Sequence, residues 1–389
     1  MTRLAQRERK IPAVRLRAIK GALVLASLLV PAVVATRPGQ APPETPSSSI
    51  PAYSVLYSFK GTPDGASPAA GVIRDAAGNF YGTTFYGGAS GWGTVFKLDT
   101  TGKETVLYSF TGGADGANPY NAGLVSDTAG NLYGTTYYGG SVACSPPTGC
   151  GVVFKVDPAG RETVLHSFTG GADGSNPNAG LVRDVAGNLY GTTGFGGSLA
   201  ACNTPYGCGV VFKVDPTGKE TVLHSFAGYP TDGASGATTT FNNPFYGARL
   251  VRDAAGNLYA TTPGGGASRD GTVFKLDAAG KETVLYSFTG GADGGNPFAG
   301  LVRDTAGNLY GTAWTGGSGD CGADSCGVVF KVDTNGKETV LHSFAYSSAG
   351  SAGPNDLIRD SAGNLYGTTA YGGSACGSFG CGVVFKLAP

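Results

Sequence analysis

Apolar and polar residues alternate along most of the chain in short runs of six or seven residues, a spacing typical of β-strands. One stretch shows four such runs in succession, at residues 122–127, 131–136, 151–157 and 162–168. Turns of the forms D-x-A-G-N and D-x-x-G-[KR]-E separate them, and their Asp and Gly residues favour tight reversals. Because no helical period lies between these runs, the pattern predicts an all-β fold.

The four-run unit recurs along the chain. The motif G-N-[LF]-Y-[GA]-T occurs six times, at intervals of 51 to 69 residues, with its Asn at Asn79, Asn131, Asn188, Asn257, Asn308 and Asn364. A period above 40 residues with four strands per unit is typical of a propeller, in which neighbouring units cover each other's faces. We therefore expect a six-bladed β-propeller of four-stranded blades over residues 53–389.

The two ends of the repeat region are complementary. The segment V-L-[YH]-S-F opens this region at Val55, whereas the chain ends just after a V-F-K-L segment at Val384. If V-L-[YH]-S-F forms the outermost strand of a blade, the last blade lacks that strand. We expect the N-terminal strand, residues 54–59, to complete the last blade and so close the ring.

The N-terminus has the features of an export signal. Residues 1–20 are basic, and residues 21–35 form an uncharged apolar run that ends in Val33-Val34-Ala35. This order predicts a signal peptide over residues 1–35, either cleaved or retained as an N-terminal anchor. Residues 36–52 are rich in Pro and Ser and are expected to form a linker. The predicted location is therefore secreted, periplasmic or at the cell surface, with no stable membrane span after cleavage.

Charge argues against nucleic acid as a partner. Residues 1–35 hold seven basic residues and one acidic residue, which leaves 20 basic and 26 acidic residues in the rest of the chain. Phosphate binding requires a basic face, and this body is mildly acidic.

All eight cysteines follow the signal and form four close pairs in sequence. Because the pairs recur in the repeats, we expect four local disulfides; metal binding is the alternative, although no His lies near any pair. The pairs are Cys144 with Cys150, Cys202 with Cys208, Cys321 with Cys326, and Cys376 with Cys381.

The repeated units G-N-L-Y-G-T-T, G-V-V-F-K-V-D and L-H-S-F-T-G-G-A-D-G resemble the Gloeobacter/Verrucomicrobia-type tandem repeat. The resemblance covers about residues 53–389. It implies an exported bacterial propeller-like repeat protein and no particular activity. A looser likeness to NHL-type and gluconolactonase-like propellers lies in the D-x-x-G-N-L-Y turn.

No residue set stands out as catalytic. The three histidines, His166, His224 and His342, occupy a strand position that holds Tyr in other copies, which indicates packing or an edge position. The repeated D-x-A-G-N aspartates are expected to cap turns, and the Arg before most of them to pair with carboxylates. No cofactor is expected; a second Asp set in D-G turns gives calcium binding as an alternative.

Differences between copies are more informative, since function in repeat scaffolds lies in departures from the repeat. Two variable connections, after N-L-Y-G-T-T and after V-L-x-S-F, are expected on one face. We expect ligand binding there by its aromatic residues, packing being the alternative. These residues are Phe85, Tyr86, Tyr137, Tyr138, Phe195, Trp314 and Tyr371.

The function predicted from these features is a noncatalytic binding or interaction module, expected to be monomeric. Its ligand would be a glycan or a protein on the variable face, because aromatic rings with Thr, Asn and Asp suit a sugar. Two alternatives remain, namely a metal-dependent lyase or lactonase-like propeller enzyme and a structural component of the cell envelope.

Overall fold

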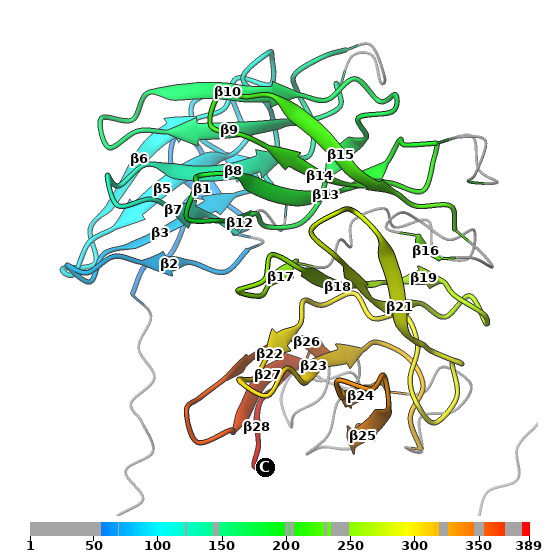
Figure 1. Cartoon of the computed structure of the whole chain (residues 1–389). Helices are drawn as coiled ribbons and strands as arrows, with labels where there is room; N and C mark the ends of the chain where they lie inside the picture. Colours follow the sequence, from blue (N-terminus) through cyan, green and yellow to red (C-terminus); the bar gives the residue numbers. More distant parts are fainter. Residues whose placement is uncertain are drawn as a thin grey trace, which may run out of the picture. The chain divides into compact units, whose positions relative to one another are not determined.

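The computed structural model describes residues 56–68, 70–120, 123–142, 148–198, 202, 206–228, 232–234, 249–318, 326–345, 354–369 and 383–389. The predicted signal and linker lie outside these residues. Within the described ranges all regular structure is β-strand (Figure 1), and no helix there is long and apolar enough to cross a membrane.

The strands form the six-bladed β-propeller expected from the repeats. Blade 1 contains β2 (Ile73–Arg74), β3 (Phe80–Thr84), β5 (Thr94–Leu98) and β6 (Glu104–Ser109). Blade 2 contains β7 (Val125–Ser126), β8 (Leu132–Thr136), β9 (Val152–Val156) and β10 (Glu162–Ser167). Blade 3 contains β12 (Val182–Arg183), β13 (Leu189–Phe195), β14 (Val210–Val214) and β15 (Glu220–Ser225).

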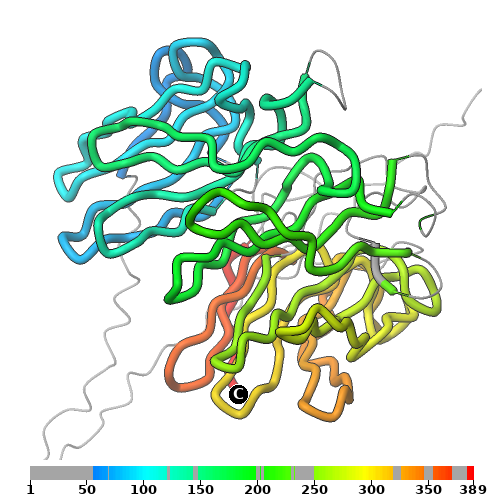
Figure 2. The backbone as a smooth tube through the Cα atoms, turned by 45° about the horizontal axis from the view of Figure 1, so that its top comes forward, coloured from blue at the N-terminus to red at the C-terminus, as the bar shows by residue number. Residues whose placement is uncertain are grey.

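The remaining blades repeat this order along the chain, as the colours of Figure 2 show. Blade 4 contains β17 (Val251–Arg252), β18 (Leu258–Thr262), β20 (Thr272–Leu276) and β21 (Glu282–Ser287). Blade 5 contains β22 (Val302–Arg303), β23 (Leu309–Ala313), β24 (Val328–Val332) and β25 (Glu338–Ser343). Blade 6 has three described strands, β26 (Pro354–Arg359), β27 (Leu365–Thr369) and β28 (Val384–Leu387).

Strands within each blade pair antiparallel in sequence order. In blade 2, for example, Gly134 of β8 lies opposite Phe154 of β9. A Cβ atom at Gly134 would lie 2.7 Å from the Phe154 ring. The Gly of the L-Y-G-T motif therefore leaves room for the Phe of V-F-K in the neighbouring strand.

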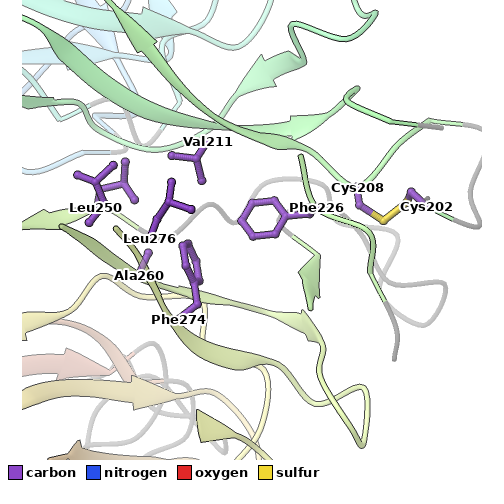
Figure 3. Close-up of a cluster of buried hydrophobic side chains, with 9 residues drawn as sticks. Cys202, Cys208, Val211, Phe226, Leu250, Ala260, Phe274 and Leu276 are labelled. Atoms are coloured by element: carbon purple, nitrogen blue, oxygen red, sulfur yellow. A yellow bond between two sulfur atoms is a disulfide. The ribbon is translucent and has the colours of Figure 1, made fainter. Parts of the chain in front are cut away.

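Blades pack on each other through stacked apolar residues. The Phe that ends the outer strand of one blade meets the V-F-K Phe of the next blade edge to face, as with Phe110 and Phe154 at 5.1 Å between ring centroids. Figure 3 shows the interface of blades 3 and 4, where Phe226 and Val211 face Phe274, Leu250 and Leu276. Burial of such side chains stabilises each blade by roughly 1.5–3 kcal/mol per residue.

The repeated D-x-A-G-N aspartates cap turns, as predicted. Asp184 accepts hydrogen bonds from the backbone and side chain of Asn188 and from the hydroxyl of Tyr190, at 2.9 to 3.0 Å. The Asn side chain and the Tyr hydroxyl of the motif are thus both used to hold its Asp.

The arginines before these aspartates differ from the prediction of ion pairs. The guanidinium carbon of Arg252 lies 5.6 Å from the ring centroid of Tyr190 in the preceding blade. The same arrangement joins Arg183 to Tyr133, Arg303 to Tyr259 and Arg359 to Tyr310. A close arginine–carboxylate ion pair occurs instead between Arg161 and Asp157, at 2.8 Å. The planar guanidinium packs over the ring, and the charge of Arg252 still acts on Asp184 of the preceding blade.

The two variable connections lie on the same face, as expected, because they pair with each other. Short strands β1 (Gly65–Ala66) and β4 (Tyr86–Gly87) form one such ribbon, and β16 (Gly233–Ala234) and β19 (Gly264–Gly265) another. In blade 3 the strand β11 (Ser175–Pro177) pairs with the extended end of β13.

One of the predicted disulfides is fully described. Cys202 and Cys208 are bonded, with their Cα atoms 5.6 Å apart, and both are buried beside Phe226 (Figure 3). Cys150 and Cys326 are also disulfide-bonded. Their predicted partners, Cys144 and Cys321, and the whole pair Cys376–Cys381 lie outside the described residues.

The end blades differ from the inner ones. Val384 of β28 is 80% exposed, whereas its equivalents Val153, Val211 and Val329 are fully buried against the next blade. On blade 1, Val72 is 51% exposed, although its equivalents Leu124 and Leu181 are 2% exposed. Each end of the repeat array therefore carries half of an inter-blade interface.

Residues 56–59 take the place of an outer strand against blade 1. Phe59 meets Phe96 edge to face at 4.9 Å, as Phe110 meets Phe154. The hydroxyl of Tyr57 donates to Asp64, as that of Tyr108 donates to Asp115. Pairing of this segment with β28 is not among the described ladders, so ring closure by the N-terminal strand stays a prediction.

Closure can be tested at Val384. We expect Val384→Asp to lower the free energy of unfolding in urea by about 2 kcal/mol or more, because closure would bury an unpaired charge between blades. Val185→Asp is the control, since Val185 lies in a turn and is fully exposed; its change should stay within about 0.5 kcal/mol. Equal stability of the two variants would mean that this face of blade 6 stays in solvent.

Candidate functional site

A cavity of about 560 Å³ lies where the innermost segments of all six blades meet. Small residues from four blades make up much of its wall, among them Gly71, Gly123, Gly180 and Gly300. These glycines share one repeat position, immediately before the apolar residue that leads into the inner strand. Small side chains at this position keep the space between the blades open.

Two copies have a charged residue in place of this glycine, and the two charges are opposite in sign. Blade 4 has Arg249 and blade 6 has Asp356 at the position of these glycines, and both line the cavity. Asp356 accepts a hydrogen bond from the backbone N–H of Gly300 at 2.7 Å. A Cβ atom at Gly123 would lie 2.8 Å from the Arg249 guanidinium, so this Arg reaches the wall that blade 2 provides.

Three aromatic rings complete the lining. Trp314, one of the predicted binding residues, lies with its ring centroid 6.1 Å from that of Phe298, and both line the cavity. Tyr120 lines it from the connection into blade 2. Tyr120 and Phe298 both follow an Asn-Pro pair in the repeat.

The Asn of this Asn-Pro pair explains why the two rings are held in place. Asn118 and Asn296 have positive φ angles of 52° and 50°, a conformation in which Asn is enriched. Their side chains donate to the backbone oxygens of Phe85 and Pro263 in the preceding blade, at 2.8 and 2.9 Å. The following residues are thereby fixed toward the cavity.

Four further predicted residues form a cluster of rings beside the cavity. Phe85 contacts Tyr86 at 4.5 Å, Tyr137 contacts Tyr138 at 4.7 Å, and Tyr120 lies between Phe85 and Tyr137. Tyr137 is 2% exposed and Tyr86 is 54% exposed. Tyr137 therefore serves packing, whereas Tyr86 presents its ring to solvent.

The other two predicted residues do not join this cavity. Phe195 is half-buried and contacts Tyr206, with ring centroids 6.2 Å apart. Tyr371 lies outside the described residues.

A second recurring arrangement of polar groups lies between neighbouring blades. In each case it consists of a Tyr or His from the outer strand of one blade, the Asp of the D-G turn that follows, and the Glu that begins the next outer strand. We call this group the inter-blade acid slot. The described slots hold Tyr57, Asp64 and Glu104; Tyr108, Asp115 and Glu162; His166, Asp173 and Glu220; His224, Asp232 and Glu282; and Tyr286, Asp293 and Glu338.

The slot Asp is held by its own turn. Asp115 accepts hydrogen bonds from the hydroxyl of Tyr108 and from the backbone N–H and hydroxyl of Thr111, at 2.5 to 2.8 Å. The slot Glu is less well satisfied, since Oε1 of all five glutamates is buried and accepts no hydrogen bond. Burial, followed by the charge of Asp115, raises the pKa of Glu162 to about 7. Burial and Asp293 raise the pKa of Glu338 likewise to about 7.

Comparison with known proteins identifies the repeat. The family model described as the Gloeobacter/Verrucomicrobia repeat matches residues 45–249 and 242–389. The chain belongs to this family. No match was found among curated proteins.

Solved structures with similarity to this Gloeobacter/Verrucomicrobia repeat protein include two enzymes. A gluconolactonase from Xanthomonas campestris is 14% identical with a TM-score of 0.43, over 86% of this chain and 88% of that one. A luciferin-regenerating enzyme is 13% identical with a TM-score of 0.47, over 84% of this chain and 92% of that one. Likeness at this level carries no information on substrate or activity.

Two charged residues of the cavity, Arg249 and Asp356, were not predicted from the sequence, although both depart from the repeat. Aligning the six copies on their D-x-A-G-N turn places Arg249 and Asp356 in a column that otherwise contains only Gly. Both residues lie outside the longer variable loops, Arg249 shortly before β17 and Asp356 within β26.

The raised pKa values of the slot glutamates predict that the stability of the fold depends on pH. A carboxyl group with a pKa near 4.5 when unfolded and about 7 when folded stabilises the fold fully below pH 4.5 and loses that contribution as pH rises through 7. We expect the melting temperature to fall between pH 5 and pH 8, and to fall less in the double variant Glu162→Gln/Glu338→Gln. Calorimetry at both pH values measures this, and parallel falls in the two proteins would contradict it.

Proposed function

We propose that this protein is an exported, noncatalytic binding module that holds a carbohydrate in the axial cavity. The observation that carries the proposal is the combination of Trp314, Phe298 and Tyr120 with Arg249 and Asp356 around one space. Sugar rings stack their C–H faces on aromatic rings and present hydroxyls to polar groups. The guanidinium donates hydrogen bonds and the carboxylate accepts them, so both kinds of hydroxyl contact are provided.

The size and the wall of the cavity support this ligand class. A volume of about 560 Å³ falls within the range of roughly 300–1,000 Å³ found for small-molecule sites. The glycines and alanines of the inner segments let a ligand approach the backbone. The rings come from opposite parts of the array, blades 2 and 5, so a ligand between them would contact several blades at once.

Export is part of the proposal and rests on separate features. The predicted signal precedes the propeller, and the Cys202–Cys208 disulfide belongs to a type of bond that persists in oxidising compartments. The expected partner is therefore a glycan outside the cytoplasm, either free or attached to a surface.

A glycan array with the purified oxidised protein tests the function. We expect Trp314→Ala to weaken binding of the recognised glycan by about tenfold or more, a loss of roughly 1.4 kcal/mol. Trp92→Ala is the matched control, since Trp92 is 42% exposed and does not line the cavity. Arg249→Gly introduces the residue that four of the other repeats have at this position, so it should weaken binding without lowering the melting temperature.

Two results would count against a carbohydrate site in the cavity. One is an array without specific binding to any glycan. The other is binding that Trp92→Ala and Trp314→Ala reduce equally, because loss at both positions would place the ligand elsewhere or reflect general destabilisation.

A further inference from the structure

One inter-blade acid slot brings its three side chains closer together than the other described slots do. In the slots that contain Tyr108 and Tyr286, the phenol donates a hydrogen bond to the slot Asp at 2.8 and 2.9 Å. Between blades 3 and 4 the phenol is replaced by His224, whose Nε2 lies 3.1 Å from Oδ2 of Asp232. An imidazole nitrogen is a metal ligand, whereas a neutral phenol is a poor one.

Three donor groups converge in this slot. One ligand atom each from His224, Asp232 and Glu282 lie within 4.8 Å of one another. Across the described ranges of the chain, no other set of three His, Cys, Asp or Glu side chains gathers this closely. The slot of His166 contains the same residue types, but its Nε2 is 3.5 Å from Asp173 and makes no hydrogen bond.

The surroundings fix the orientation of the donors. Oδ1 of Asp232 accepts backbone N–H groups of Ala227 and Gly228 at 2.8 and 2.7 Å, which directs Oδ2 toward His224. The Asp is 6% exposed. The His224 ring stands edge-on to buried Phe226 at 4.9 Å. Such supporting contacts hold metal ligands in place before the ion arrives.

The disulfide strengthens this support. A Cβ atom at Gly228 would lie 2.9 Å from Sγ of Cys208, so the segment that binds Asp232 packs directly on the Cys202–Cys208 bridge. The bridge and the buried Phe226 (Figure 3) therefore support the segment that binds Asp232 on the blade 3 side.

The charges of the slot favour a cation. Asp232 and Glu282 bring two carboxylates to one site, and Oε1 of Glu282 is buried without a hydrogen-bond donor. A buried carboxylate oxygen without a partner calls for an ion or a water molecule at that point. A divalent ion would neutralise both carboxylates and give this oxygen a partner, with Nε2 of His224 as the neighbouring nitrogen donor.

We propose that His224, Asp232 and Glu282 bind one divalent transition-metal ion of the zinc type. One nitrogen and two oxygen donors suit Zn²⁺, whereas Ca²⁺ prefers oxygen ligands alone. Three protein ligands leave the fourth position of a tetrahedral ion to water. Since His224 and Asp232 belong to blade 3 and its exit loop and Glu282 to blade 4, the ion joins two neighbouring blades.

Titration with ZnCl₂ alone tests the site. The full-length protein is stripped with EDTA, dialysed at pH 7.5 and titrated by isothermal titration calorimetry. We expect one Zn²⁺ per chain and a rise in melting temperature on binding. His224→Tyr should weaken binding by more than the roughly 10–100-fold that loss of an outer partner costs. It should fold, because Tyr occupies this position in Tyr57, Tyr108 and Tyr286.

His166→Tyr is the matched control and should bind Zn²⁺ like the unaltered protein. Glu282→Gln provides a second variant, which keeps the shape of the side chain and removes one charged donor. The proposal is overturned if the unaltered protein takes up no Zn²⁺, or if His224→Tyr and His166→Tyr bind it equally. Loss of glycan binding in any of these variants is not expected, so the two sites can be tested separately.

Discussion

The structure depends on one contact that recurs between consecutive blades and again where residues 56–59 meet blade 1. In it a Phe packs edge to face on the V-F-K Phe of the blade that follows. Ring centroids lie 4.9 to 5.4 Å apart at all six positions from Phe59–Phe96 to Phe344–Phe385. No blade buries both faces alone, so each is stabilised by its neighbours. The third residue of L-Y-[GA]-T is Gly or Ala because a larger side chain there would displace the ring of the V-F-K Phe.

Much of this architecture could be predicted from the sequence because the repeat displays it six times. Strand number, turn positions and the capping role of Asp184 and its equivalents all follow from local patterns. The partner of the arginines could not be predicted, since Arg252 and Tyr190 belong to different copies and a motif shows only what lies within one. The axial cavity was missed for a similar reason. Arg249 and Asp356 are ordinary surface residues in sequence and meet only where six inner strands converge.

The repeat also distinguishes structural from functional residues. Tyr137 belongs to the aromatic set predicted to bind ligand, yet its 2% exposure makes it part of the packing. Trp314 belongs to the same set and lines the cavity. Aromatic character alone could not separate them. Asn176 of the following copy binds the backbone oxygen of Tyr137, whereas the copy that follows Trp314 has no Asn-Pro pair. His224 occupies a repeat position that is Tyr in other copies. This His changes the chemistry of its slot, while its ring packs on Phe226 as the Tyr rings pack on the equivalent Phe in other copies.

The exposed faces of blades 1 and 6 are complementary rather than identical, with Val72 on one and Val384 on the other. Association of two copies through these faces is therefore heterologous, head to tail, and cannot give a dimer with a two-fold axis. Within one chain the same contact would close a ring, whereas between chains it would add one copy after another in a row. Because blades 2 to 5 connect the two faces within one chain, closure within the chain would be favoured over association at low protein concentration.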